Sequence, residues 1–270
     1  MTKQKVAKNA YTRGAAASHR YSEWRTELKD FFDSERHFLP RITKPHTSML
    51  DIGGAAGGFG NAIKRSVEPT LDYTVIDPNE EYIRFGKRHF PDTAFIRGYF
   101  PKGLRSAKKY DVITMLALFP QLPDWKQTLL AMVKYGKKYL LFTLIVKQSG
   151  TTVVDKDVSY FYYFDSGERV HQVVHNLYEF VNFCSIHEMR AKSISFYGYH
   201  VPQGGGHNRS VPNHEQIRGT ALIELFDEKD YPGRISSGGA PKAFLEKHNV
   251  RVFSPSVEIV IDGKKFDSTS

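Results

Sequence analysis

The stretch Met49-Leu-Asp-Ile-Gly-Gly-Ala-Ala-Gly-Gly-Phe-Gly60 decides the fold of this 270-residue chain. Met49, Leu50 and Ile52 are apolar, as in a β-strand that is buried on both faces. The glycines that follow permit positive φ and close approach of the backbone to a ligand. Asp51 is a carboxylate near the end of a buried strand, where it needs a cationic or hydrogen-bonding partner. The stretch therefore predicts a strand, a glycine-rich turn and a helix that hold a nucleotide-like cofactor.

Apolar and amphipathic stretches alternate after this turn, at intervals typical of strands separated by helices. The pattern predicts strands over residues 71–76, 94–96, 110–116 and 139–146, and helices over residues 80–88 and 124–135. Right-handed crossovers between such strands build a parallel sheet with helices on both faces. We therefore expect an α/β fold with a doubly wound, mostly parallel sheet.

The second half of the chain has a different pattern. Two β-rich runs, residues 158–164 and 169–174, predict a hairpin inserted after the fifth strand. A helix is expected to begin near Asn176. Strands over residues 192–201 and 217–226 follow with a glycine-rich loop but no helix between them, so we expect antiparallel neighbours at the edge of the sheet.

The N-terminal segment combines basic and aromatic residues. Residues 1–18 have no apolar period, whereas the segment that starts at Tyr21 and ends at Phe32 places Trp24 and Phe31 near helical spacing. The segment therefore predicts an amphipathic helix that covers the sheet. Such a helix is also a candidate lid that brings Tyr21 or Trp24 to a substrate pocket.

These patterns divide the chain into three parts. We expect a basic tail with a cap helix over residues 1–45, and a central domain over residues 46–230. The central domain carries insertions on the substrate side near residues 150–174 and 202–216, and residues 231–270 form a C-terminal extension.

The net charge, the cysteine content and the hydropathy of the chain indicate its partners and its compartment. The net charge of +9 favours an anionic partner, although ten Lys and Arg against five Asp and Glu lie in residues 1–44, where a solvated basic tail accounts for them. A single cysteine, Cys184, excludes an internal disulfide. Since the sequence shows neither a membrane-spanning run nor a signal-peptide core, we expect a cytoplasmic protein.

The glycine turn discriminates between cofactors. Residues 53–58 nearly match the dinucleotide fingerprint, but Ala55 replaces the glycine that lets the backbone approach a pyrophosphate. Asp51 would repel a pyrophosphate. A cofactor with a cationic end and no phosphate suits these residues better, and S-adenosylmethionine has an ammonium group, a sulfonium centre and a ribose.

Asp77 ends the second strand, twenty positions after Gly57. A carboxylate in this place accepts hydrogen bonds from ribose hydroxyls, and Pro78 can lie against an adenine face. NAD would use such an acid equally well. Asp77 therefore predicts a ribose without choosing the cofactor.

Three motifs carry a resemblance to a known family. They are Leu50-Asp-Ile-Gly-Gly-Ala-Ala-Gly57, Val75-Ile-Asp-Pro78 and the run Tyr110-Asp-Val-Ile-Thr-Met-Leu-Ala-Leu-Phe-Pro-Gln-Leu-Pro-Asp-Trp125. Together with the order of elements, they resemble the class I S-adenosylmethionine-dependent methyltransferases, and the last run resembles the small-molecule branch. The resemblance implies a seven-stranded Rossmann-like sheet in which an antiparallel strand is inserted at the edge.

The same resemblance implies the cofactor contacts. Asp51 is expected to face the methionine end of S-adenosylmethionine, and Asp77 its ribose. The remaining expected cofactor-site residues lie in the glycine turn or follow strands two, three and four: Gly53, Gly54, Ala55, Gly57, Pro78, Gly98, Tyr99, Leu116 and Ala117. Two departures from the family pattern are Ala55 in place of glycine and Tyr99 where an acid often stands.

Six of the eleven histidines fall between His171 and His214, in the half of the chain expected to cover the methyl acceptor. We expect His200 or His207 to act as a general base or an acceptor contact. Tyr162 and Tyr199 are expected to bind the acceptor. His171 and His175 have the spacing of a metal pair, but no nearby carboxylate pattern completes a site, so we expect no metal.

The acceptor class is the open question. We expect O- or N-methylation of a small molecule or a saccharide. An alternative is an RNA methyltransferase, because the turn resembles that of ribose-methylating enzymes; those enzymes rely on an acid at the end of the fourth strand, where this chain has Leu116-Ala-Leu-Phe119. A non-catalytic module that binds S-adenosylmethionine is a third possibility.

Overall fold

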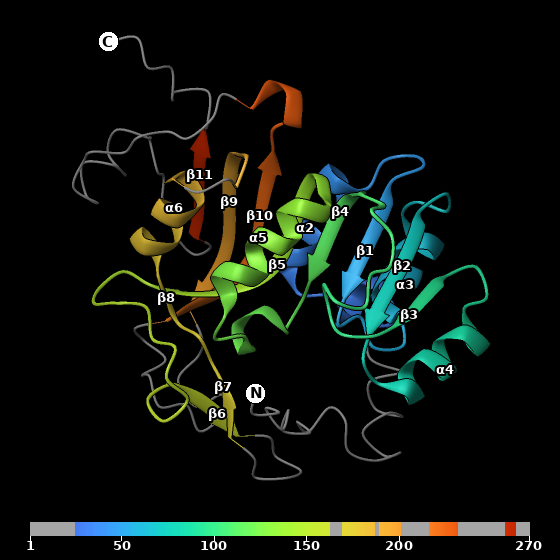
Figure 1. Ribbon diagram of the computed structural model, residues 1–270, viewed down its shortest axis with the longest axis horizontal. Coiled ribbons are helices and arrows are strands. Elements are labelled where there is room, and N and C mark those ends of the chain that lie inside the picture. The colour runs from blue at the N-terminus through green and yellow to red at the C-terminus, as the bar shows by residue number, and fades with distance from the viewer. Residues whose placement is uncertain (1–24, 163–168, 187–188, 201–215, 232–256, 263–270) are drawn as a thin grey trace.

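The computed structural model describes residues 25–162, 169–186, 189–200, 216–231 and 257–262. They form a twisted nine-stranded sheet between two layers of helices, and a separate two-stranded sheet (Figure 1). The strands are β1 (Ser48–Ile52), β2 (Asp72–Asp77), β3 (Ala94–Arg97), β4 (Tyr110–Met115), β5 (Gly136–Lys147), β8 (His175–Asn176), β9 (Ala191–His200), β10 (Ile217–Leu225) and β11 (Val257–Asp262).

The order across the sheet is β11-β9-β10-β5-β4-β1-β2-β3, with β8 paired to β5. Strands β1 to β5 are mutually parallel, and β10 runs antiparallel between β5 and β9. Seven of these strands, in the order β3-β2-β1-β4-β5-β10-β9, confirm the expected mostly parallel Rossmann-like sheet. Strands β9 and β10 are antiparallel neighbours as expected, and β11 pairs with β9 as one further outer strand.

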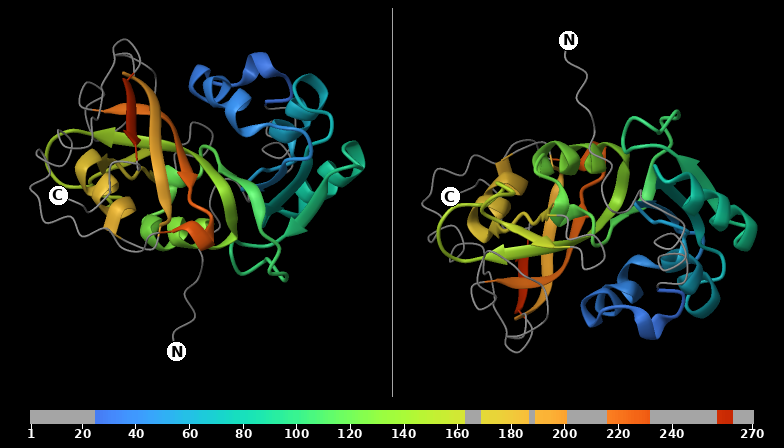
Figure 2. Two further views of the ribbon diagram at one scale, coloured as in Figure 1. Left: turned by 90° about the horizontal axis from the view of Figure 1, so that it is seen from above. Right: turned by 90° about the horizontal axis from the view of Figure 1, so that it is seen from below.

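Two hydrophobic clusters hold the helices to the sheet. On one face, α5 (Trp125–Tyr135) and α6 (Leu177–Ile186) bury apolar side chains such as Leu129 and Phe180. On the other, α2 (Asp33–Ile42) and α3 (Gly58–Ser66) bury Phe38 and Ile63. Figure 2 shows these two layers from above and below. Helix α4 (Glu80–His89) packs against β2 and β3.

The predicted N-terminal helix is displaced along the chain. Residues Leu28–Asp30 form only a short 3-10 helix, η2, and the longer helix α2 begins at Asp33. The side chain of Glu35 accepts a hydrogen bond from the backbone N–H of Phe32 at 3.0 Å, which starts the helix there. Phe31 is consequently buried, whereas Phe32 is 40% exposed. Tyr21 and Trp24 lie outside the described residues.

The inserted hairpin is confirmed. Strands β6 (Tyr160–Tyr162) and β7 (Arg169–His171) pair antiparallel, apart from the main sheet. Helix α6 begins at Leu177, as expected, with Asn176 Oδ1 accepting from the Glu179 N–H at 3.0 Å. Within the described part of the chain, no helix has the length and apolar character needed to span a membrane.

Candidate active site

A pocket of about 310 Å³ opens at the carboxyl ends of β1, β2 and β4. Because β1 pairs parallel with both β2 and β4, these carboxyl ends meet at one edge of the sheet, where α/β folds bind ligands. Of the residues predicted for the cofactor, all but one line this pocket: Asp51, Gly53, Gly54, Ala55, Asp77, Pro78, Gly98, Tyr99, Leu116 and Ala117. The exception is Gly57, which precedes α3 and approaches Phe95 and Asn61 instead.

The turn after β1 has the conformation that the glycines suggested. Gly53 has φ of +71° and Gly57 has φ of +86°. A Cβ atom on Gly54 would lie 2.5 Å from Asp51 Oδ2, so only glycine leaves room for that carboxylate. Ala55 also adopts positive φ, at +48°, and its N–H points at Asp77.

Asp51 is buried beneath the turn, where two hydroxyl groups hold its carboxylate. Thr114 Oγ1 donates to Oδ1 and Tyr73 Oη donates to Oδ2, both at 2.6 Å. Burial raises the pKa of Asp51, while these two hydrogen bonds and the charge of Arg25 oppose the increase. Asp51 therefore has the structural partners that its burial demands, and it still lines the pocket.

Asp77 joins the turn to the end of β2. Its Oδ2 accepts from the Ala55 N–H at 3.1 Å and its Oδ1 from the Asn79 N–H at 2.8 Å. Burial raises the pKa of Asp77 to about 6, against the effect of these two backbone donors. The carboxylate can accept further bonds from a ligand, because two oxygens offer about four lone-pair sites.

Arg25 lines the same pocket and was not predicted. Its side chain is buried and forms an ion pair with Glu35. Burial lowers its pKa to about 10, so the guanidinium remains charged at neutral pH. No sequence motif marks this arginine; the only signal was its place next to an aromatic-rich segment expected to cover the sheet.

Part of the pocket lining is apolar. Phe100, Leu118 and Leu122 contribute to it, and of these Phe100 and Leu118 directly follow the predicted residues Tyr99 and Ala117. Ala117 has φ of +60°, and its N–H donates to Thr143 Oγ1 at 2.8 Å. The loop after β4 is thus held to β5 where Ala117 lines the pocket.

The residues predicted for the acceptor are only partly described. Strand pairing aligns Ile217 with both Val146 of β5 and His200 of β9, so the end of β9 lies at the cofactor edge of the sheet. The side chains of Tyr162, Tyr199 and His200 fall outside the description, as do Tyr21, Trp24 and His207 entirely. Their proposed roles therefore remain predictions.

The insertion after β5 packs beside the pocket. The Val173 N–H donates to the carbonyl of Pro120 in η3 (Phe119–Gln121), the short helix that follows the pocket residues of β4. The buried Gln172 Nε2 donates to Gln216 Oε1 at 2.9 Å. These contacts join the insertion to η3 and to the residue that precedes β10.

His171 and His175 do not share a polar site. His175 is fully buried against Phe119, Trp125 and Phe180, and burial lowers its pKa to about 3. Neither ring nitrogen has a hydrogen-bond partner among the described residues. Those residues also contain no cluster of three or more His, Cys, Asp or Glu side chains suited to a metal.

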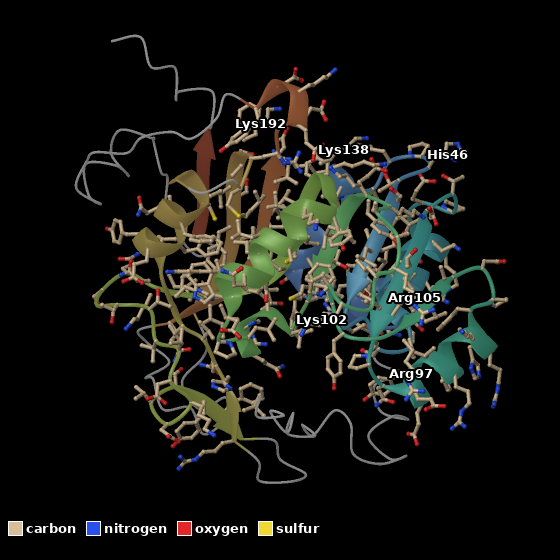
Figure 3. All side chains as sticks on the ribbon, viewed as in Figure 1. His46, Arg97, Lys102, Arg105, Lys138 and Lys192 are labelled. Atoms are coloured by element: carbon tan, nitrogen blue, oxygen red, sulfur yellow. The ribbon has the colours of Figure 1, made fainter. Side chains whose placement is uncertain are left out.

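Figure 3 labels six basic side chains of the surface, which come from β3, β5, β9 and the connecting loops. Three of the six pair with carboxylates: Arg97 with Glu80 at 2.7 Å, Lys138 with Asp111 at 3.2 Å and Lys192 with Glu224 at 2.6 Å. Part of the positive charge is therefore balanced locally.

Solved structures of other proteins are similar to this fold. The chain is similar to phosphoethanolamine N-methyltransferase 2 of Haemonchus contortus, crystallised with phosphomonomethylethanolamine and S-adenosylhomocysteine. The identity is 10% over 74% of this chain and 53% of that one, with a TM-score of 0.52. It is also similar to a Galdieria sulphuraria protein assigned as a sarcosine dimethylglycine methyltransferase, at 13% identity over 77% and 86% of the two chains and a TM-score of 0.51.

No curated protein matches the sequence. A family model described as a methyltransferase domain, however, matches residues 17–195, which is the greater part of the chain. The chain belongs to this methyltransferase-domain family, which confirms the prediction of a class I S-adenosylmethionine-dependent methyltransferase.

Proposed function

We propose that the protein transfers a methyl group from S-adenosylmethionine to the oxygen or nitrogen of a small-molecule or saccharide acceptor. The observation that carries this proposal is the pocket at the strand ends, whose mainly apolar lining includes the charged residues Asp51, Asp77 and Arg25.

The pocket residues fit S-adenosylmethionine better than a dinucleotide. The charged residues that line the described pocket are two acids and one arginine, an arrangement that disfavours a pyrophosphate. Asp51 would hold the ammonium group, and Asp77 the ribose hydroxyls. The apolar residues Phe100, Leu118 and Leu122 suit an adenine ring.

The bound cofactor supplies an activated methyl group, so the protein needs chiefly to align the acceptor and exclude water. The backbone of the loop after β4 and the insertion that packs on η3 border the side where the acceptor would enter. If the acceptor is a hydroxyl, a base must also remove its proton, and His200 and His207 remain our candidates.

Two similar structures are named for amine-containing substrates, phosphomonomethylethanolamine in one case and sarcosine and dimethylglycine in the other. These names support a small polar acceptor as the first class to test. They do not distinguish nitrogen from oxygen as the methylated atom of this protein.

The experiment is a methyltransfer assay with a panel of small amines, phenols and saccharides, in which S-adenosylhomocysteine release is measured by mass spectrometry. We expect release that depends on one class of acceptor. Release that depends on RNA instead, with binding that weakens steeply with salt, would overturn the proposed acceptor class. Cofactor binding without turnover on any acceptor would favour a binding module.

A further inference from the structure

We infer that Glu35 is a positioning residue, which holds the Arg25 guanidinium at the pocket so that Arg25 receives the carboxylate of the cofactor's methionine end. This inference rests on the proposed function, because it requires S-adenosylmethionine in the pocket.

The ion pair between Arg25 and Glu35 is buried on both sides. Arg25 is 5% exposed and Glu35 is 0% exposed. An exposed ion pair contributes little, but a buried charge that loses its partner is strongly unfavourable. The position of Glu35 therefore constrains where the Arg25 guanidinium can lie.

Glu35 is itself fixed by the backbone. Its Oε2, the oxygen that pairs with Arg25, also accepts from the Phe32 N–H at 3.0 Å at the start of α2. The other oxygen, Oε1, is buried and makes no hydrogen bond to any described residue. One carboxylate oxygen thus links the beginning of α2 to the arginine that lines the pocket.

Aromatic rings surround the guanidinium. Its central carbon lies 5.6 Å from the ring centre of Phe31, 5.5 Å from that of Phe32 and 5.4 Å from that of Phe59. Phe31 and Phe59 stack at 4.7 Å, and Phe59 also lines the pocket. The face of an aromatic ring attracts a cation, so these three rings favour a position of the Arg25 guanidinium beside the pocket.

The backbone of Arg25 is in a conformation that arginine rarely adopts, with φ of +62°. Strain of this kind tends to occur where a side chain must reach a functional site. A purely structural tie between the N-terminal segment and α2 would not require the arginine to line the pocket.

The charges around the pocket match both ends of an amino acid. Asp51 carries the sign that an ammonium group needs, and Arg25 the sign that a carboxylate needs. A guanidinium has five N–H donors, so pairing with Glu35 through Nη2 is compatible with recognition of a second carboxylate.

The test compares two ligands that differ only by the carboxylate: S-adenosylmethionine and decarboxylated S-adenosylmethionine. Calorimetric affinities are measured for the wild type, Arg25→Gln and Glu35→Gln. The glutamine at position 35 keeps an acceptor for the Phe32 N–H but loses the charge that orients Arg25. Arg36→Gln and Asp33→Asn are matched controls, because this exposed pair lies on the same helix and outside the pocket lining.

We expect the wild type to prefer the carboxylated ligand. Arg25→Gln should weaken S-adenosylmethionine binding by about 10- to 100-fold, as for loss of a charge-assisted hydrogen bond, and leave the decarboxylated ligand nearly unaffected. Glu35→Gln should reduce the same preference by a smaller factor. Both controls should behave as the wild type.

Equal losses for the two ligands, or none, would overturn the inference and leave Glu35 a structural residue. If Arg25→Gln fails to fold, Arg25→Lys replaces it, since lysine keeps the charge but not the planar fork, and a partial loss of preference is then expected. Failure of the wild type to bind either ligand would instead refute the proposed function.

Discussion

Two buried carboxylates, Asp51 and Asp77, end neighbouring parallel strands but are held by different groups. Side-chain hydroxyls donate to Asp51, whereas backbone N–H groups donate to Asp77. Asp77 has a pKa of about 6, so its charge changes close to physiological pH. This difference makes the two residues separable by experiment.

The charge of Asp77 should make cofactor binding depend on pH. In the proposed cofactor complex the ionised carboxylate would accept hydrogen bonds from the ribose hydroxyls, so affinity for S-adenosylhomocysteine should fall as pH decreases below about 6. The contribution of Asp77 to the stability of the free protein should move the other way and increase as pH decreases. The folded pKa exceeds the unfolded value of about 3.9, so this group lowers stability fully above pH 6 and progressively less toward pH 4.

Calorimetry between pH 5 and 8 checks the affinity, and the difference in thermal unfolding between the wild type and Asp77→Asn over the same range isolates the contribution of Asp77 to stability. Asp77→Asn should flatten the dependence of affinity on pH. A wild-type affinity that stays constant from pH 8 to pH 5 would mean that Asp77 does not contact the ligand.

Tyr73→Phe should destabilise the protein because it removes the hydroxyl that donates to Asp51 Oδ2. The expected loss is about 1–3 kcal/mol in the free energy of unfolding, measured by urea denaturation. Thr74→Val is the matched control, since the neighbouring Thr74 hydroxyl is buried without a hydrogen bond to any described residue. Equal effects of the two substitutions would contradict the role given to Tyr73.

At the scale of elements, the strand-turn-helix unit was predictable because its signals are local. The apolar run, Asp51 and the glycines all lie within a dozen residues, so this short stretch alone indicates where the strand ends and the turn begins. The start of α2 was not predictable in the same way. The aromatic residues between positions 24 and 32 have a spacing that resembles a helix, but the Glu35 side chain accepts a hydrogen bond from the Phe32 N–H, and the helix begins at Asp33. Arg25 could not be predicted as a pocket residue, because its partners, such as Glu35 and Phe59, are brought to it by tertiary packing.

The turn after β1 offers a test with opposite expectations at adjacent positions. Gly54→Ala should abolish or strongly weaken cofactor binding, since the new Cβ would lie 2.5 Å from Asp51 Oδ2. Ala55→Gly should retain binding, because glycine adopts the φ of +48° found there without steric cost. Fluorescence titration with S-adenosylhomocysteine compares them. Retained affinity in the Gly54 variant would show that Asp51 is not held as described.

His175, in β8, should make the protein sensitive to acid. Its folded pKa of about 3 lies below the unfolded value of 6.5, so stability from this group is present above pH 6.5 and is lost as pH falls. At pH 5 the loss is about 2 kcal/mol. Unfolding of His175→Phe across pH 5 to 8 should show a smaller decrease than the wild type, and identical profiles would exclude His175 as the cause.

At the scale of the whole molecule, the strands β1 to β5 and the helices between them could be predicted from the sequence, whereas the rest of the fold could be predicted only in part. From β1 to β5 the sequence alternates between apolar stretches and amphipathic stretches, which indicate strands and helices. All of the predicted cofactor residues except Gly57 line the pocket at the ends of these strands. The remainder of the fold is built from an insertion, an antiparallel strand pair and β11, joined by contacts between distant residues such as Gln172 and Gln216. No local pattern specifies those contacts, so His200 and His207 remain predictions.

The most direct test of the account is calorimetric titration of S-adenosylmethionine and S-adenosylhomocysteine into the wild type, Asp77→Ala and Asp72→Ala. Asp72 and Asp77 stand at opposite ends of β2, and Asp72 pairs with Lys108 at 2.9 Å on the surface. We predict that the wild type and Asp72→Ala bind both ligands. Asp77→Ala should bind about 100-fold more weakly through loss of charge-assisted ribose bonds. No binding by the wild type, or equal affinities of the two variants, would contradict the placement of the cofactor at the strand ends.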